Sequence, residues 1–338
     1  MPYITISKKN FFNNLDIIAQ KTQSKDKIAL VLKDNAYGHG LNLMATLANE
    51  YGITKAVVQN DQEAKSISPL FESVLVLADI PKEASRKIHY TINTPEDIPR
   101  FPQGTKVHLK VDTGMHRNGV DPKELKEAFA AITKQGLKLV GVFSHHRSAD
   151  ELTGEWFWQK ENFQKVKETS ILLAKKFDLP RPIFHLSNSA SLMRSADFNE
   201  DMARVGIAAY GCMDLPSALS TESFKPVLSL YANKIATKKL PKGARIGYGG
   251  AHTLKEDATI STYDIGYGDG FMRALSHDYT TPEGCKIAGR ISMDNSSFYC
   301  DKERLLIFDD AREVAKKAGT ISYEVLTSLK PDIPREIV

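Results

Sequence analysis

Short apolar runs recur through the first two thirds of the chain, separated by segments that have the periodicity of helices. Continuous runs of this kind are typical of parallel strands that are buried on both faces. The runs span residues 28–32, 56–59, 74–77, 88–92, 107–111, 139–143, 183–186 and 205–209, and the helical segments include 122–134 and 156–177. These eight alternations predict an α/β fold, a closed (β/α)8 (TIM) barrel.

An open, doubly wound sheet is the alternative, but no Gly-x-Gly-x-x-Gly motif follows the first run. The pattern changes after about residue 225, where alternating β-type segments dominate and helical periodicity is scarce before 303–317. We therefore predict a barrel domain over 1–225 and a mainly β domain over 226–338. Near the N-terminus a short strand precedes Ser7, which can cap the following helix.

Composition and charge argue against several classes of function. The formal net charge is only +4, the pI is near 8.7, and no Lys/Arg cluster follows one face, so we expect no nucleic-acid partner. No apolar run approaches the roughly 20 residues of a membrane span, and no signal peptide is evident. Cys212, Cys285 and Cys300 lack metal-ligand spacing, so we expect free thiols in a reducing, cytoplasmic compartment and no metal site.

The most informative stretch is 31–40, Val-Leu-Lys-Asp-Asn-Ala-Tyr-Gly-His-Gly. Lys33 stands where the first apolar run ends, at the carboxyl end of a predicted buried strand. Burial disfavours the ammonium form and lowers the pKa of a lysine. A neutral amine attacks carbonyls, which is the Schiff-base chemistry of pyridoxal 5′-phosphate (PLP) enzymes. A lone lysine here would more often be a surface residue, so the prediction depends on the whole motif.

Further polar residues stand at the ends of predicted strands, where barrel enzymes collect their functional groups. They are Lys110 and Arg117 in the stretch that closes the fifth run, His145 after the sixth, Asn188 and Ser189 after the seventh, and Arg204 immediately before the last. Phosphate sites in such barrels often follow strands seven and eight. Ser189 and the backbone near Gly206 and Ile207 are therefore candidates for a phosphate site.

Lys-Asp-Asn-Ala-Tyr-Gly-His-Gly at 33–40 resembles the PLP-lysine signature of alanine racemases (fold type III), and the resemblance covers nearly the whole chain. It implies that Lys33 carries PLP and that Arg204 faces the pyridine nitrogen. It also implies that Lys110, often carbamylated in the family, braces Arg117 near the substrate carboxylate. The implied cofactor-binding residues are Lys33, Tyr37, His145, Asn188, Ser189, Arg204, Gly206 and Ile207.

The resemblance extends to the second predicted domain. Tyr248 matches the second catalytic acid/base, and Tyr267, Met293 and Asp294 match residues that line the substrate pocket. The matches at the pocket mouth are His145, Asp150, Arg273 and Arg290. Because the family forms head-to-tail homodimers, each barrel is expected to receive Tyr248 and Met293 from a partner.

The resemblance implies a PLP-dependent racemase that interconverts L- and D-alanine by a two-base mechanism and supplies D-alanine for peptidoglycan. Racemisation needs one acid/base on each face of the substrate, here Lys33 and Tyr248. The alternatives are a broader or serine-preferring racemase, a decarboxylase of the barrel-plus-β type, and a non-catalytic PLP carrier. A decarboxylase would place a carboxylate where Arg204 stands, and PLP carriers of this fold lack a second domain.

One departure from the family concerns the pocket mouth. The family usually carries a tyrosine three residues before its Pro-Arg pair, and alignment on Tyr323 and 334–335 places Pro331 there. That tyrosine normally touches the phosphate and narrows the mouth. Proline has neither a side-chain donor nor an N–H, so we expect weaker PLP binding and measurable serine racemisation, with alanine still preferred.

Overall fold

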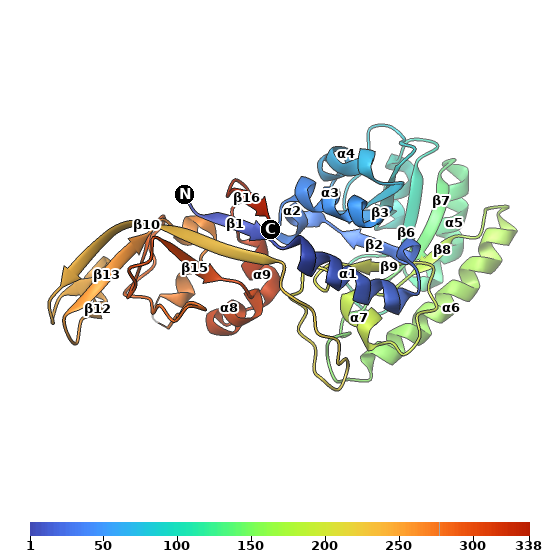
Figure 1. Cartoon of the computed structure of the whole chain (residues 1–338). Coiled ribbons are helices and arrows are strands. Elements are labelled where there is room, and N and C mark those ends of the chain that lie inside the picture. Colours follow the sequence, from blue (N-terminus) through green and yellow to red (C-terminus); the bar gives the residue numbers. More distant parts are fainter. Residues whose placement is uncertain (277) are drawn as a thin grey trace.

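The computed structural model describes residues 1–276 and 278–338 and places a barrel beside a smaller, mainly β domain (Figure 1). The barrel strands are β2 Ile28–Val31, β3 Lys55–Val58, β4 Ser73–Val76, β5 Ile88–Ile92, β6 Lys106–Lys110, β7 Lys138–Phe143, β8 Ile183–His185 and β9 Ala203–Val205. They pair in the order β8-β7-β6-β5-β4-β3-β2-β9, each parallel to its neighbours. This nearly closed order confirms the predicted barrel, because a doubly wound sheet would reverse its strand order at a switch point.

The eighth strand differs from the predicted one. β9 ends at Val205, the residue at which the sequence pattern places its start. Beyond it the backbone turns on itself, since the Ala209 N–H donates to the Gly206 carbonyl at 2.9 Å. Residues 206–211 are apolar because they are buried, not because they form a strand. Arg204 consequently lies within the strand.

Helices pack around the outside of the barrel, as the apolar spacing predicts (Figure 1). They include α1 Lys8–Thr22, α3 Leu41–Tyr51, α4 Asp61–Ile67, α5 Leu125–Lys134 and α6 Glu155–Lys176. Two shorter segments, α2 Lys33–Tyr37 and α7 Ser189–Arg194, follow β2 and β8 at the carboxyl ends of the strands, and α2 contains residues with non-helical backbone angles. Ser7 caps α1, since its hydroxyl accepts the Asn10 N–H at 3.3 Å. The predicted helix 122–134 begins with a separate 3-10 turn, η4 Pro122–Glu124.

The C-terminal domain is organised around one sheet of order β14-β13-β10-β1-β16, with β15 also paired to β10. Its elements are β1 Tyr3–Ile6, β10 Leu228–Leu240, β13 Ala258–Tyr263, β14 Ser296–Phe298, β15 Arg304–Phe308, β16 Arg335–Ile337, and the ribbon of β11 Arg245–Ile246 with β12 His252–Thr253. The N-terminal strand β1 joins this sheet by pairing with β10 and β16. Strands from both ends of the chain thus lie in one sheet, so the N-terminal strand belongs to the C-terminal domain and not to the barrel. The predicted domain boundary at 225/226 stays a prediction.

Two helices, α8 Ala311–Ala318 and α9 Ser322–Thr327, complete the domain. The helical periodicity predicted over 303–317 is wrong in its first half, which is the strand β15. The remaining 3-10 turns are η1 Lys25–Lys27, η2 Ser68–Leu70, η3 Pro95–Arg100, η5 Tyr248–Gly250, η6 Tyr267–Asp269 and η7 Arg273–Leu275. Among the described residues, no helix is long and apolar enough to cross a membrane. The three cysteines are buried and free.

Candidate active site

A cavity of about 610 Å³ opens at the carboxyl ends of the barrel strands. It is lined by all ten site residues predicted from the barrel sequence: Lys33, Tyr37, Lys110, Arg117, His145, Asn188, Ser189, Arg204, Gly206 and Ile207. Four of these carry a positive charge, whereas Asp34 and Glu324 are the only carboxylates in the lining. The excess of cations favours anionic ligands such as a phosphate or a substrate carboxylate.

The turn after β2 holds an uncommon backbone conformation. Asp34, Asn35, Ala36 and Tyr37 have φ between 50° and 55°, which is left-handed and costs roughly 1–2 kcal/mol per residue for non-glycine residues. Asn35 helps to hold it: its side-chain oxygen accepts the Leu41 N–H at 2.8 Å, and its carbonyl accepts the Gly40 N–H at 3.0 Å. Strain of this kind persists at functional sites only where the surroundings enforce it.

This turn brings Lys33 and Tyr37 into the same cavity. Lys33 is less buried than its position at a strand end predicts, since its side chain keeps 32% of its exposure and its Nζ lies 3.2 Å from the Asp34 carboxylate. Lys33 is partly exposed because it lies beyond the end of β2 and its side chain lines the cavity. Tyr37 is buried, and burial raises the pKa of its phenol, so the hydroxyl remains a donor.

The cradle beside Tyr37 is built from α7 and the turn after β9. Ser189 Oγ accepts the Gly206 N–H at 3.1 Å and the Ala208 N–H at 3.4 Å. Asn188 caps α7, its side-chain oxygen accepting the Ser191 N–H at 2.9 Å. A Cβ at Gly206 would lie 2.7 Å from the Tyr37 hydroxyl oxygen. The absence of a side chain at Gly206 therefore lets the Tyr37 hydroxyl lie against the turn whose N–H groups donate to Ser189.

Arg204 is the most deeply held cation of the site. The residue is 5% exposed, and burial lowers the pKa of its guanidinium to about 10, so it stays charged at neutral pH. Nη1 donates to His185 Nδ1 at 2.5 Å and to the His185 carbonyl at 2.9 Å. Nη2 donates to the carbonyls of Ser144 at 2.6 Å and Leu186 at 3.2 Å. Four of the five N–H groups are thus occupied, and the Nε–H has no partner among the described residues.

Lys110 and Arg117 lie on either side of a compact loop. The Lys110 amine donates to the side-chain oxygen of Asn118, whose amide in turn donates to Asn93 Oδ1 at 2.9 Å. Burial lowers the pKa of Lys110 to about 8, and the nearby charges of Arg117 and Arg204 add to this effect. Lys110 is therefore still mostly charged at pH 7, and its neutral share reaches about one half near pH 8.

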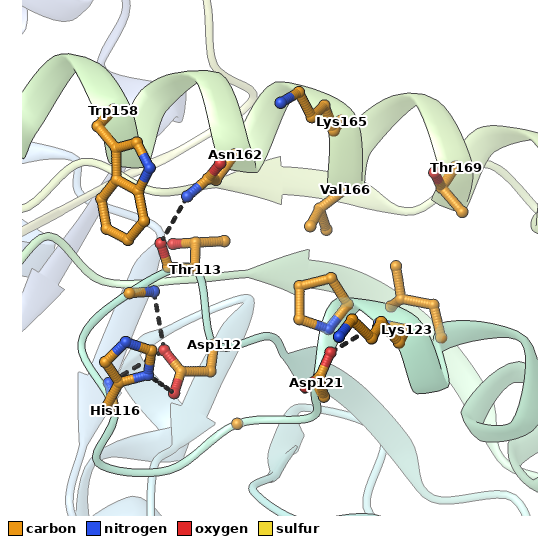
Figure 2. A pocket seen from close by; sticks show the side chains of 14 residues that line it. Asp112, Thr113, His116, Asp121, Lys123, Trp158, Asn162, Lys165, Val166 and Thr169 are labelled. Carbon is orange, nitrogen blue, oxygen red and sulfur yellow. Dashed lines mark hydrogen bonds and ion pairs between the residues drawn. The ribbon is translucent and has the colours of Figure 1, made fainter.

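Asp112 shapes the loop that carries Arg117 (Figure 2). Its Oδ1 accepts the N–H groups of Gly114 at 2.9 Å and His116 at 3.1 Å, and its Oδ2 lies 3.2 Å from His116 Nδ1. A Cβ at Gly114 would lie 2.2 Å from the Trp158 ring. Asp112, Gly114, His116 and Trp158 help to line a second cavity of about 390 Å³, and none of the ten predicted barrel residues lines it.

Two residues that sequence reasoning missed hold the cavity mouth. Arg335 donates from Nε at 2.9 Å and from Nη2 at 2.8 Å to the Gly38 carbonyl, which ties the C-terminal segment to the turn after Lys33. Tyr323 of α9 lines the cavity, with its ring centroid 5.7 Å from that of Tyr37. Burial raises the pKa of Tyr323 to about 12. In the sequence, Tyr323 is followed by Glu324, and nothing in this local pattern predicts that the tyrosine lines a cavity.

Pro331 does not occupy the place that the alignment assigns to it. It is exposed and absent from the cavity lining, and its carbonyl accepts Arg335 Nη1 at 2.8 Å. Tyr323 supplies an aromatic ring at the mouth instead. The expected place of Pro331 at the mouth is therefore not seen in the cavity of this chain, and the weaker PLP binding and serine racemisation inferred from it stay predictions.

The site residues predicted from the C-terminal domain do not line the cavity of their own chain. They are exposed: Tyr248 keeps 70% and Met293 56% of their accessible surface, and Tyr267 and Asp294 are also open to solvent. The Gly268 N–H donates to the Met293 carbonyl at 2.8 Å, so the 267 and 293 segments are adjacent. Figure 1 shows β12, which follows the Tyr248 turn, at the end of the domain that points away from the barrel.

The positions matched to the pocket mouth are also spread out. His145 lines the cavity, and burial, together with the nearby cationic groups, holds its pKa well below the usual range. Asp150 lines a neighbouring cavity of about 240 Å³ that shares Tyr323 and Ile207 with the main one. Arg273 and Arg290 lie in the C-terminal domain, outside both linings. No cluster of three or more His, Cys, Asp or Glu suited to a metal is present in the described part of the chain.

Comparisons with known proteins agree with this architecture. Residues 6–214 match the family described as alanine racemase, N-terminal domain, and residues 227–337 match the alanine racemase C-terminal domain. An alanine racemase of a Nitratiruptor species is 45% identical over 335 residues, covering 99% of each chain. A solved alanine racemase of Clostridium difficile 630 superposes with a TM-score of 0.90 at 27% identity, covering 100% of this chain and 95% of the other. A solved histidine racemase of Leuconostoc mesenteroides has a TM-score of 0.87 at 24% identity over 100% and 98% of the chains, so the fold alone does not select the substrate.

Proposed function

The chain belongs to the alanine racemase family of isomerases, and from this premise we propose that it interconverts L-alanine and D-alanine with PLP as its cofactor. The observation that carries the proposal is the joint placement of ten predicted barrel residues in one cation-rich cavity. A volume near 610 Å³ is within the usual range for cofactor and substrate sites.

The cavity fits PLP in charge and in donor groups. Lys33 would hold the cofactor through its amine, and the hydroxyls of Tyr37 and Ser189 beside Gly206 would face its phosphate. When bound, PLP supplies an electron sink that acidifies the substrate Cα–H. The remaining Nε–H of Arg204 would donate to the pyridine nitrogen and leave it uncharged, because guanidinium has no acceptor. This donor disfavours the decarboxylase alternative, which calls for a carboxylate.

Two acid/base groups would move the proton. Lys33 would serve the face from which D-alanine loses its proton, and Tyr248 the face used by L-alanine. Arg117, with Tyr267, Met293 and Asp294, would hold the substrate. Carbamylation of Lys110 would give Arg117 an anionic partner, and the neutral share of this amine near pH 8 supports that modification.

The site requires a homodimer in this proposal. Tyr248 and Met293 are exposed and lie outside the cavity of their own chain, so a head-to-tail partner would bring them to it. The C-terminal domain also disfavours a barrel-only PLP carrier. The supply of D-alanine for peptidoglycan and the cytoplasmic location stay predictions from the sequence.

Hydrogen exchange tests the proposal directly. With PLP, the protein should release α-deuterium from both D- and L-alanine without releasing CO2. Tyr248→Phe should slow exchange from L-alanine by about 10²–10⁴-fold and affect D-alanine less. Release of CO2 would point to the decarboxylase, and equal slowing of both enantiomers would contradict the assignment of one base to each face.

A further inference from the structure

Three buried histidines form a continuous line through the barrel interior below Arg204. His89 of β5 lies with its Nδ1 3.1 Å from His108 Nε2 on β6. His108 Nδ1 lies 2.9 Å from His185 Nε2 at the end of β8. His185 Nδ1 receives Arg204 Nη1 at 2.5 Å. The line therefore runs from near the amino end of β5 to the floor of the candidate active site.

A glycine makes this line possible. β6 and β8 are not neighbours, because β7 lies between them, and His108 is in register with Gly141 of β7. A Cβ at Gly141 would lie 2.4 Å from His108 Nδ1. The missing side chain thus lets the His108 ring reach across β7 to His185. The His185 ring is held from the other side by Phe143, which stacks on it at 4.7 Å.

The hydrogen bonds leave only one arrangement of protons. Arginine is a donor only, so His185 Nδ1 must accept and the proton of this neutral ring must sit on Nε2. That Nε2–H then donates to His108 Nδ1, which places the His108 proton on its own Nε2. His108 Nε2–H donates in turn to His89 Nδ1. Burial lowers the pKa of all three rings, which agrees with their being neutral.

We infer that these three histidines form a positioning relay: each ring carries its proton on Nε2, and together they fix the orientation of Arg204. A ring flip or tautomer change at any point would set two donors or two acceptors against each other. With the relay intact, Arg204 Nη1 and Nη2 are held by the protein and Nε–H is the group left for the cavity. Its consequence for the cofactor rests on the proposed function, whereas the relay itself does not.

The tautomers are read by NMR of protein labelled with ¹⁵N-histidine, first without PLP. We expect Nδ1 of all three rings to be unprotonated and Nε2 to be protonated near neutral pH. A protonated Nδ1 on His185 in the native protein would overturn the inference whatever the variants do. Because no cofactor or turnover is involved, failure of the relay and failure of the proposed racemase activity are distinguishable.

Two substitutions at His108 form the matched pair. His108→Gln keeps one acceptor and one donor, so it should retain the His185 tautomer, the visible absorbance of bound PLP and kcat within about 3-fold. His108→Leu keeps neither. It should disturb the His185 signals, shift that absorbance and lower kcat by about 10-fold or more, since a misplacement of about 1 Å can cost about 10²-fold.

Gly141→Ala provides a second route that leaves every histidine in place. The new methyl group would displace the His108 ring, so the His185 signals and the PLP absorbance should change as they do in His108→Leu. If His108→Leu does not fold, Gly141→Ala and His108→Gln still decide the question. A folded Gly141→Ala or His108→Leu with native His185 signals and native PLP absorbance would overturn the relay.

Discussion

The barrel and the C-terminal domain hold their shares of the candidate site in opposite ways. In the barrel, Arg204 is 5% exposed and its guanidinium donates hydrogen bonds to four protein acceptors. In the C-terminal domain, Tyr248 is 70% exposed and stands on a short turn between two ribbon strands. The barrel share is thus preorganised within one chain, whereas Tyr248 is exposed to solvent and, in the proposed function, would need a partner chain to reach a cavity. The proposed dimer would combine the two shares and would cover the exposed side chain of Tyr248.

Among the substitutions that test this comparison, removal of Lys33 should have the largest effect on activity. Lys33→Ala should abolish the visible absorbance of bound PLP and lower racemisation by at least about 10²–10⁴-fold, because both the cofactor attachment and one acid/base are lost. Absorbance spectra and alanine racemisation check both effects. A borohydride-reducible PLP adduct that persists in Lys33→Ala would refute the assignment, and Lys27→Ala, on the preceding turn, serves as the control.

Mixed dimers test whether the two shares come from different chains. Lys33→Ala and Tyr248→Phe should each be nearly inactive, yet a mixed dimer would keep one site with both residues intact. Equal mixing with random exchange makes half of the dimers mixed, so about a quarter of native activity should return. Subunit exchange is verified with differently tagged chains. No recovery after verified exchange would place the complete site within one chain.

The pKa of Lys110 predicts a pH-dependent modification of the barrel share. Its pKa is lowered to about 8, so the neutral amine that reacts with CO2 should increase as pH rises through 8 and decrease below it. At fixed dissolved ¹³CO2, the NMR signal of a protein-bound carbamate should follow that direction. Lys110→Ala should lose the signal and about 10–100-fold in kcat/KM, as expected when Arg117 loses a charged partner.

Lys106→Ala is the matched control for this experiment, because Lys106 lies on the same strand but outside the cavity lining. It should keep the carbamate signal. A signal that survives in Lys110→Ala would assign the carbamate to another lysine.

The smallest effect should be on specificity at the cavity mouth. Tyr323→Ala removes the ring that packs beside Tyr37 and should raise the serine-to-alanine ratio of kcat/KM by about 3- to 10-fold, because a roomier pocket rejects an added hydroxyl poorly. Tyr323→Phe keeps the ring and should change the ratio little. Pro331→Tyr should leave it within about 2-fold. A large drop in the ratio for Pro331→Tyr would restore the role inferred from the alignment.

Much of the barrel could be predicted because each buried parallel strand appears in the sequence as a short continuous apolar run. Seven of the eight strands lie where continuous apolar runs predict them, and the strand-end residues follow from that placement. β9 was misplaced because residues 206–211 are buried without being a strand, and an apolar run alone cannot separate those cases. In the same way, the alternating pattern of β15 was hidden beside the helix that follows it.

By itself, the sequence determined the barrel, the lysine motif and the ten residues that converge on one cavity. Nine of the ten follow from the strand ends, because parallel strands bring their carboxyl ends together, and Tyr37 follows from the family resemblance. Only the tertiary structure decided that Tyr323 rather than Pro331 lines the mouth, and that β1 joins the C-terminal sheet. It also decided that Gly141 lets His108 reach His185 across an intervening strand. These contacts join residues distant in the chain, and their geometry depends on side chains packing in three dimensions rather than on any local spacing.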